Sequence, residues 1–398
     1  MYDVIIVGAG IAGSYTAGKL AGQGLRVCVL EKNAHAGHKS SCTGIVSRDC
    51  FELLPVDTRI VQWQARSAKI FSPSGKYIRV ERETTQAYIL DRPALDLSIA
   101  KQAEASGAEF HFSTYVSGIH KDAKSVRVQG SDKNGQVSFE SKVVVIASGF
   151  GTSFTKALGL GQINEYAQGA QVEVVNKDIE EVEVYSGTDI APGFFAWLVP
   201  AGAGRAKAGL LCRNNPGPYI KILLEHLQQQ GKIEAVRSNI SYGAVPLKPL
   251  ARTYADRLIV IGDAAGQVKP TTGGGIYFGL LCARIAVGTI CDTIKNNNFS
   301  ARNLSVYQKK WHEMLKRELA IDYWAHKFYR KLSDRQIEHI FDIIEHHSIH
   351  ESLLASPDIT FDWHSNVILD AIKHRSLDKS LGKLNLRLAS HSNNSKRR

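Results

Sequence analysis

The chain has 398 residues, of which 44% are hydrophobic and 22% are charged, so it can bury an ordinary core, and a disordered or fibrous protein is excluded. The formal net charge is +11, but residues 371–398 hold eight Lys or Arg and one acidic residue. The rest of the chain is only mildly basic, and we expect no nucleic-acid partner.

The N-terminus and the cysteines indicate the compartment. The chain leads from Met1 directly into an apolar strand pattern without the features of a signal peptide. The apolar window 273–290 is glycine-rich and contains Arg284, which makes it a poor membrane span. Six scattered cysteines without a CxxC pair predict reduced thiols, with neither a disulfide framework nor a zinc site. We expect a cytoplasmic protein that does not cross a membrane.

The first residues predict a βαβ unit. Residues 2–7 form an apolar run typical of a buried parallel strand, residues 11–23 follow a helical pattern, and residues 26–31 form a second strand. Gly8, Gly10 and Gly13 stand between the first strand and the helix as a GxGxxG motif, which gives a tight turn, close approach of a pyrophosphate and close helix–strand packing. This part of the chain therefore predicts a dinucleotide site.

A carboxylate completes this motif. Glu31 follows Gly13 by eighteen residues, where it can bind the ribose hydroxyls of adenosine. The contacts predicted for this unit are Gly8, Gly10, Ala12, Gly13, Glu31 and Lys32.

The middle of the chain alternates between two patterns. Residues 66–90 and 168–212 hold β-rich stretches separated by turn residues, which predicts a separate antiparallel sheet supplied by two insertions. Between them, the helix-like segment 93–106 and the strand 143–148 return the chain to the first unit. Residues 301–388 are mainly helical in pattern.

A second glycine-rich segment decides which dinucleotide is expected. An apolar strand over 258–261 leads into Asp263, which is placed to hydrogen-bond the ribityl chain of a flavin. The helix start from Gly273 to Ile276 offers N–H groups to the edge of the isoalloxazine. Because NAD needs no such second segment, we predict FAD, held here by Gly262, Asp263, Gly274, Gly275 and Ile276.

Several motifs together resemble one family. They are the GxGxxG with its Glu31, YILDRPALD over 88–96, VVVIASG over 143–149 and GDAAGQVKPTTGGGIYFGL over 262–280. With the Cys-Thr-Gly of 42–44 and FAWLVP over 195–200, the chain resembles the geranylgeranyl reductase family of FAD-dependent oxidoreductases, within the wider aromatic-hydroxylase-like group. The resemblance covers residues 1–300. The chain departs from the family pattern at Val199, where an aromatic is usual, and at Thr43, where glycine is common.

The resemblance implies an α/β protein in three parts. A Rossmann-like FAD-binding domain with a parallel sheet carries an inserted antiparallel β-sheet domain for the substrate and is followed by a helical C-terminal region. The expected boundaries are 1–50, 88–165 and 250–300 for the FAD-binding domain, 51–87 and 166–249 for the substrate domain, and 301–398 for the helical region with its basic tail.

The resemblance also implies roles for single residues. Arg92 would contact the flavin nucleotide and Val116 would present its backbone to the adenine; the alternative for Arg92 is an ion pair with Asp91 or Asp96. The loop of Cys42, Thr43 and Gly44 would lie at the reactive side of the flavin. Cys42 is then a candidate proton donor, with ordinary burial of a small apolar side chain as the alternative.

An apolar wall and two surface features complete the candidates. Phe195, Trp197 and Pro200 are interpreted as one side of a substrate slot, with core packing as the alternative. Histidines at 339, 346, 347 and 350 are interpreted as a solvated helix face and not as a metal site. Leucines at 377, 381, 384 and 388 among basic residues are typical of a helix on an anionic bilayer, with packing against the body as the alternative.

The expected reaction is hydrogenation of carbon–carbon double bonds in an isoprenoid chain on a diphosphate or lipid head group. Electrons would come from an external donor, NAD(P)H or a ferredoxin-like protein, because the sequence holds no further dinucleotide motif. The alternatives are a flavin-dependent monooxygenase or halogenase on the same fold, and a non-catalytic prenyl-lipid carrier. We expect a cytoplasmic enzyme with peripheral contact to a membrane; the oligomeric state, the isoprenoid length and the head group stay open.

Overall fold

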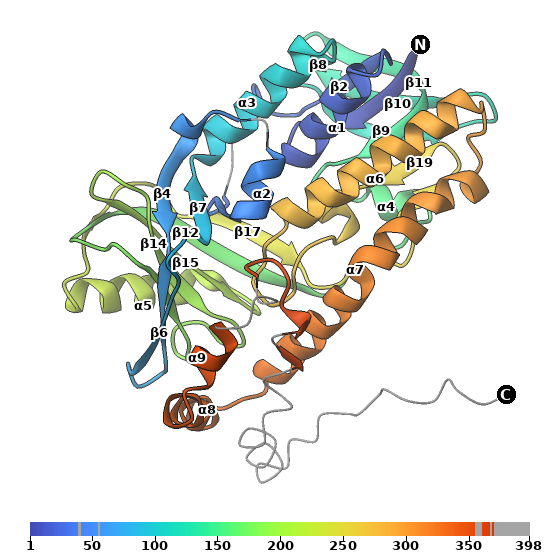
Figure 1. Ribbon diagram of the computed structural model, residues 1–398. Coiled ribbons are helices and arrows are strands. Elements are labelled where there is room, and N and C mark those ends of the chain that lie inside the picture. Colours follow the sequence, from blue (N-terminus) through green and yellow to red (C-terminus); the bar gives the residue numbers. More distant parts are fainter. Residues whose placement is uncertain (39–40, 55, 355–359, 367, 370–398) are drawn as a thin grey trace, which may run out of the picture.

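A sheet whose central strands run parallel forms the core of the first half of the molecule (Figure 1). The computed structural model describes residues 1–398 except 39–40, 55, 355–359, 367 and 370–398. The order of the sheet is β18-β19-β11-β1-β2-β8, and all neighbours from β19 to β8 run parallel. Its strands are β1 (Tyr2–Val7), β2 (Val27–Leu30), β8 (Glu109–His111), β11 (Gly135–Ile146), β18 (Tyr254–Ala255) and β19 (Leu258–Val260), and the hairpin of β9 (Tyr115–Lys121) and β10 (Val126–Asp132) continues from β11.

Helices cover this sheet with apolar faces. Strand β1 is buried along Val4–Val7, as expected for a parallel strand with both faces covered. Helix α1 packs against α3 and α6, and α6 packs against α7, so the largest apolar core lies between them and the sheet. These helices are α1 (Ile11–Ala21), α3 (Arg92–Ala105), α6 (Ile276–Lys295) and α7 (Ala301–Tyr329), with the short α4 (Phe154–Ala157).

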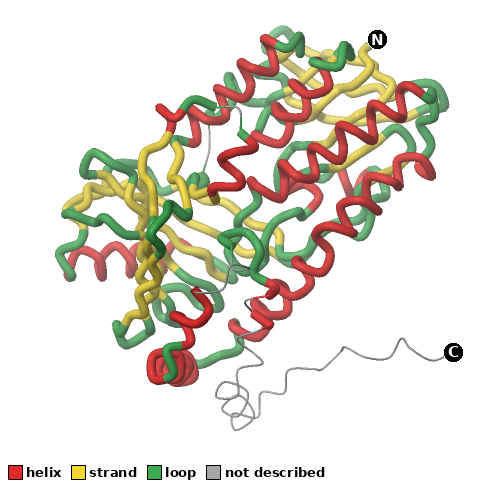
Figure 2. The backbone as a smooth tube through the Cα atoms, in the orientation of Figure 1, coloured by secondary structure: helices red, strands yellow, loops and turns green. Residues whose placement is uncertain are grey.

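The second half is a second, mostly antiparallel sheet (Figure 2). Its order is β16-β12-β15-β14-β13-β5-β6, with β17 also paired to β12, and α5 packs on β12 and β15. Strands β5 and β13 run parallel to each other, a departure from the expected antiparallel sheet. They come from different insertions and are joined by a long crossover, so no hairpin forces them antiparallel. The elements are β5 (Ser67–Phe71), β6 (Tyr77–Glu81), β12 (Tyr166–Asn176), β13 (Val182–Tyr185), β14 (Ala196–Pro200), β15 (Arg205–Cys212), α5 (Pro216–Gln229), β16 (Ile233–Val236) and β17 (Ser241–Pro246).

A three-stranded sheet, β3-β7-β4, lies between the two. Strand β4 belongs to the segment that we assigned to the substrate domain, yet it pairs with β7 of the FAD-binding segment. The division into domains therefore remains our proposal. The elements here are β3 (Ile45–Ser47), α2 (Arg48–Leu53), η1 (Thr58–Ile60), β4 (Val61–Ala65) and β7 (Ala87–Leu90).

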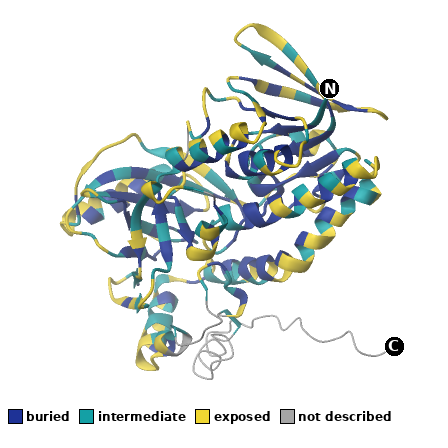
Figure 3. Cartoon of the chain, turned by 45° about the horizontal axis from the view of Figure 1, so that its top comes forward, coloured by how far each residue is buried: buried dark blue, intermediate teal, exposed yellow. Residues whose placement is uncertain are grey.

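The C-terminal region continues beyond α7 with α8 (Asp334–His346) and α9 (Ile349–Leu354). The predicted amphipathic tail helix lies outside the described residues. Among the described helices, α6 is long and apolar enough to span a membrane by length and composition alone. In the fold it packs between α1 and α7. Figure 3 shows buried residues, in dark blue, where the helices face one another and the sheet.

One buried side chain ties α7 to the second glycine-rich segment. The Tyr307 hydroxyl donates to the Val260 carbonyl at 3.0 Å and accepts from Gln267 Nε2 at 2.8 Å. The Gln267 Oε1 in turn accepts from the backbone N–H of Gly262 at 2.8 Å. Helix α7 therefore sets the turn that carries Asp263, the next residue along.

We expect Tyr307→Phe to destabilise the protein by about 1–3 kcal/mol, because it leaves the amide of Gln267 and the Val260 carbonyl without a buried partner. Chemical denaturation measures this free energy. Tyr323→Phe is the control, since the Tyr323 hydroxyl bonds Glu165 near the surface at 2.7 Å and should contribute less. Equal losses in the two variants would contradict the assigned role of Tyr307.

Candidate active site

A cavity of about 380 Å³ lies where the two halves meet. Both glycine-rich turns, the Cys42 loop, the second sheet and a C-terminal segment contribute to its wall. The lining residues that matter below are Gly10, Ala12, Cys42, Thr43, Arg92, Gln171, Trp197, Asp263, Lys269, Gly274, Gly275, Ile276 and Asp362.

The first turn has the geometry that its glycines predict. At Gly8 the φ angle is +106°, and a Cβ would lie 2.5 Å from the Ala147 carbonyl oxygen. At Gly13 a Cβ would lie 2.0 Å from the Gly8 oxygen, so helix and strand touch at the backbone. A Cβ at Gly10 would meet nothing within 4 Å. Gly10 therefore leaves open space at the start of α1, where a phosphate can approach.

The Glu31 carboxylate hydrogen-bonds the backbone of the same turn. Its Oε2 accepts from Ala9 N at 2.9 Å, and its Oε1 accepts from the backbone and side chain of Asn33 at 2.8 and 2.7 Å. Glu31 is thus already a backbone anchor of the turn. Lys32 is exposed, Val116 is buried in β9, and neither lines the cavity. Their contacts to a cofactor remain predictions.

The second turn brings Asp263 to the same cavity. Gly262 has a φ of +65°, and a Cβ at Gly275 would lie 2.8 Å from Asp263 Oδ1. The carboxylate therefore lies against the first turn of α6. Burial raises the pKa of the Asp263 carboxyl, while the Arg92 guanidinium acts in the opposite direction.

Two helix N-termini meet at this cavity without side-chain caps. Gly10 caps α1 and Gly275 caps α6, and neither position supplies a side-chain hydrogen bond. The first N–H groups of each helix and their positive dipole ends are therefore free to bind an anion or a carbonyl. A flavin dinucleotide has both, a diphosphate and a ring edge of carbonyl and nitrogen acceptors. The residues fit FAD, with Asp263 available to accept from a hydroxyl group.

Arg92 has the ion pair that we considered as the alternative. Its guanidinium contacts both carboxylate oxygens of Asp96 at 3.1–3.2 Å, and both side chains are largely buried. Arg92 nevertheless lines the cavity. The pairing therefore holds the guanidinium in place at the cavity wall, and it does not remove Arg92 from the site.

The loop of Cys42, Thr43 and Gly44 is held from two sides. Gly44 has a φ of +81°, and a Cβ there would lie 2.3 Å from the Leu90 oxygen. The Thr43 hydroxyl donates to Gln171 Oε1 at 2.6 Å, and Lys207 Nζ donates to the Thr43 carbonyl at 2.7 Å. The Cys42 side chain faces the cavity and is exposed, so it is not packed in the core.

The sequence did not indicate Gln171, which lines the cavity, or Lys207, which supports the Cys42 loop. Lys207 lies on β15 with 9% exposure, and burial lowers its pKa. Its Nζ also contacts the Leu90 carbonyl at 3.4 Å. Strand alternation alone could not have found it, because its partner Thr43 is 164 residues away.

Of the three predicted wall residues, Trp197 lines the cavity. Its ring lies on Gly209 of the neighbouring strand, where a Cβ would come within 2.5 Å of the indole. The Phe195 ring contacts the Trp197 ring at a centroid distance of 5.9 Å, and Phe195 itself does not line the cavity. Pro200 follows Trp197 by three residues on β14, so its side chain points to the opposite face of the strand. It is buried and does not line the cavity.

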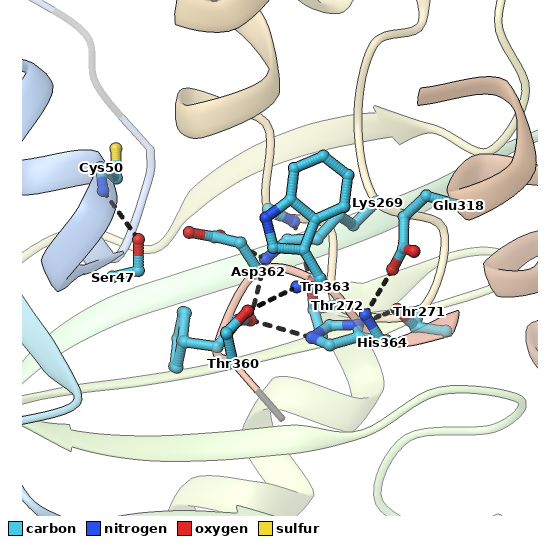
Figure 4. A network of polar contacts seen from close by, with 12 residues as sticks. Ser47, Cys50, Lys269, Thr271, Thr272, Glu318, Thr360, Asp362, Trp363 and His364 are labelled. Atoms are coloured by element: carbon cyan, nitrogen blue, oxygen red, sulfur yellow. Dashed lines mark hydrogen bonds and ion pairs between the residues drawn. The ribbon is translucent and has the colours of Figure 1, made fainter. Parts of the chain in front are cut away.

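A C-terminal segment, residues 360–366, closes another side of the cavity (Figure 4). We call it the strap. Lys269 Nζ pairs with Asp362 Oδ1 at 2.8 Å, and both side chains are almost fully buried. In Figure 4 the second carboxylate oxygen of Asp362 points toward Ser47 and Cys50, and it has no hydrogen-bond partner among the described residues.

Helix α7 anchors the strap from behind. The Glu318 carboxylate accepts from the backbone N–H groups of His364 and Ser365. Thr271, from the loop before α6, donates to Asp322 at 3.0 Å and contacts His364. The strap, the second glycine-rich segment and α7 are therefore one polar network. No spacing in the sequence pointed to it.

The described residues contain no group of three or more His, Cys, Asp and Glu side chains that could hold a metal ion, and all six cysteines are free thiols.

The chain matches known flavoproteins. A family model described as an FAD binding domain matches residues 1–205. The chain is 32% identical over 363 residues to digeranylgeranylglycerophospholipid reductase 2 of Methanothermobacter thermautotrophicus, covering 86% of this chain and 92% of that protein. It is 30% identical over 350 residues to digeranylgeranylglycerophospholipid reductase of Methanocaldococcus jannaschii, covering 85% and 89%.

A solved structure shows the same fold. A geranylgeranyl bacteriochlorophyll reductase-like protein from Thermoplasma acidophilum superposes with a TM-score of 0.85 at 24% identity, covering 96% of this chain and 99% of that one. The fold, the matched FAD binding domain and the two similar reductases agree with the motifs quoted from the sequence. The chain belongs to the geranylgeranyl reductase family of FAD-dependent oxidoreductases.

Proposed function

We propose that this protein is an FAD-dependent reductase that hydrogenates carbon–carbon double bonds of an isoprenoid chain carried on a lipid head group. One observation carries the proposal: Cys42, Trp197 and the two uncapped helix N-termini share one cavity. The similar reductases named above, which act on geranylgeranyl chains of a glycerophospholipid by their names, support the substrate class. The electron donor would be external, either NAD(P)H or a ferredoxin-like protein.

Different walls of the cavity would bind the cofactor and the substrate. Bound FAD would supply the hydride for the double bond. The N–H groups of α1 and α6, together with Asp263, would hold the cofactor, and Arg92 would add a fixed positive charge. Trp197 would lie against the apolar chain, and its wall would exclude water from the reacting carbons.

The Cys42 loop would serve the second half of the addition. Once one carbon of an alkene accepts hydride, the other carbon needs a proton. The Cys42 thiol is exposed to the cavity, and Lys207 and Gln171 fix the backbone and side chain of the next residue. A thiol held in this way can donate a proton at a defined position.

We expect Asp263→Asn to weaken FAD binding by roughly tenfold to a hundredfold, because a charge-assisted hydrogen bond becomes a neutral one. Equilibrium dialysis against FAD measures the dissociation constant. Asp189→Asn, an exposed loop position, is the control. An unchanged constant in Asp263→Asn would remove Asp263 from the cofactor site.

The same variant should stabilise the apoprotein at neutral pH. Because the pKa of Asp263 is raised, the folded apoprotein binds this proton more tightly than the unfolded chain does. The contribution of Asp263 to stability therefore falls as pH rises above the ordinary pKa of aspartate and stays unfavourable at neutral pH. Thermal melting of wild type and Asp263→Asn should show a Tm gain at pH 7 that shrinks in acid. A loss at pH 7 would contradict this sign.

We expect Cys42→Ala to slow reoxidation of pre-reduced flavin by a polyprenyl lipid by ~10²-fold or more, the usual scale for a positioned acid. Anaerobic stopped-flow absorbance measures this half-reaction. Reduction of the flavin by dithionite and the FAD content should stay at wild-type values. Cys42→Ser should fall in the same direction, since a hydroxyl is a weaker acid. Wild-type reoxidation in both variants would assign the proton to another donor, and turnover that requires oxygen would favour a monooxygenase.

We expect Gly209→Ala to lower kcat/KM for the isoprenoid substrate by roughly tenfold or more, because the added methyl group displaces the Trp197 ring from its place. FAD content should not change. Gly288→Ala on α6 is the control, because a Cβ at that position meets nothing within 4 Å. Equal activity of the two variants would exclude Trp197 from the substrate wall.

A further inference from the structure

The outer face of α7 carries apolar side chains that the fold leaves in solvent. Val306, Met314 and Trp324 are 40%, 42% and 63% exposed. They recur with Lys310, Arg317 and Ile321 at steps of three and four residues, so they form one continuous stripe along the helix. We call this set the α7 stripe: Val306, Lys310, Met314, Arg317, Ile321 and Trp324.

The exposed charges beside the stripe are mostly basic. The residues of α7 that flank it include exposed basic residues at 302, 309 and 316 and a partly buried lysine at 327. Of the three acidic residues of α7, only Glu313 is exposed, because Glu318 and Asp322 are buried against the strap and the Thr271 loop. Neither Lys310 nor Arg317 forms an ion pair with any residue that the structure describes.

We propose that the α7 stripe is the surface by which this protein docks on an anionic lipid bilayer. An indole flanked by cations on long apolar stems is the combination that settles at the boundary between head groups and acyl chains. The inner side of the same helix holds the strap that lines the cavity. Docking through α7 would therefore bring the cavity close to the membrane. The biological reason for docking rests on the proposed function, whereas the vesicle experiment below does not depend on it.

Charge argues against two other occupants. A second copy meeting this face about a twofold axis would bring two mostly basic surfaces together, with Glu313 as the one exposed acid of α7 to offset them, which is unfavourable. The C-terminal segment 371–398, with eight basic residues and one acid, has the same sign as the stripe. Anionic lipid head groups complement both the charge and the exposed apolar side chains.

The test measures where the bilayer touches the full-length FAD-loaded protein. Vesicles of phosphatidylglycerol and brominated phosphatidylcholine contain no isoprenoid, and bromine quenches tryptophan that enters the acyl region. We expect quenching in these vesicles and none in neutral ones. Trp324→Phe should lose most of it, whereas Trp63→Phe, at a partly buried position on β4, should keep it.

Charge reversal provides the second arm. Lys310→Glu/Arg317→Glu should weaken binding to the anionic vesicles at least ~tenfold. Lys101→Glu/Lys221→Glu changes the net charge equally at exposed positions on α3 and α5 and should bind nearly as wild type. Equal weakening in both pairs, or binding without quenching of Trp324, would overturn the proposal. So would self-association that Trp324→Phe abolishes, which would assign the stripe to a second copy.

Failure of this proposal and of the proposed function are separable. Bilayer docking without hydrogenation of a polyprenyl lipid would leave the α7 assignment intact and reject the reaction. Hydrogenation of detergent-dispersed polyprenyl lipid without any docking through Trp324 would do the reverse.

Discussion

Two helices direct uncapped N-termini at one cavity, and the rest of the structure keeps them there. A helix end with unsatisfied N–H groups is unfavourable when it is enclosed without a partner. Because the cap positions 10 and 275 are glycine, neither cap residue has a side chain that could satisfy these groups. Glu31 and Gln267 each bind a backbone N–H of one of the two turns. The fold therefore maintains a site that is complete only with a ligand of matching acceptors.

Two side chains of the second half of the molecule hold the loop of Cys42 in this site. Lys207 extends from the mostly antiparallel sheet to the Thr43 carbonyl, and Gln171 accepts from the Thr43 hydroxyl. The Lys207 ammonium is buried, and its hydrogen bonds to described residues go to the Thr43 and Leu90 carbonyls, so desolvation lowers its pKa. The position of the Cys42 loop thus depends on both halves being packed together.

Residue patterns predicted the features that depend on residues close together in the sequence. The GxGxxG turn, its Glu31 and the turn at Asp263 are local strand–turn–helix units, and each has the expected backbone geometry. Strand alternation also separates Trp197 from Pro200, a distinction that our grouping of both in one wall ignored. The contacts of Arg92 and Val116 with the cofactor remain predictions.

Contacts between distant segments could not be predicted in this way. Lys207 and Thr43 are 164 residues apart, and Lys269 and Asp362 are 93 apart. Neither pair has a spacing that marks it, because the partners meet only after two sheets and the helical region pack. The parallel pairing of β5 with β13 was missed for the same reason: it depends on how two insertions meet.

Asp263 and the open helix ends have a consequence for the amount of protein in a cell. Burial disfavours the charged form of the Asp263 carboxylate, which lowers the stability of the folded protein until a ligand hydrogen-bonds this group. Binding of a ligand to the folded state alone stabilises that state by mass action. Newly made chains that bind flavin would then be degraded less, since a difference of about one to two kcal/mol changes abundance several-fold. The supply of flavin would then contribute to how much folded protein accumulates.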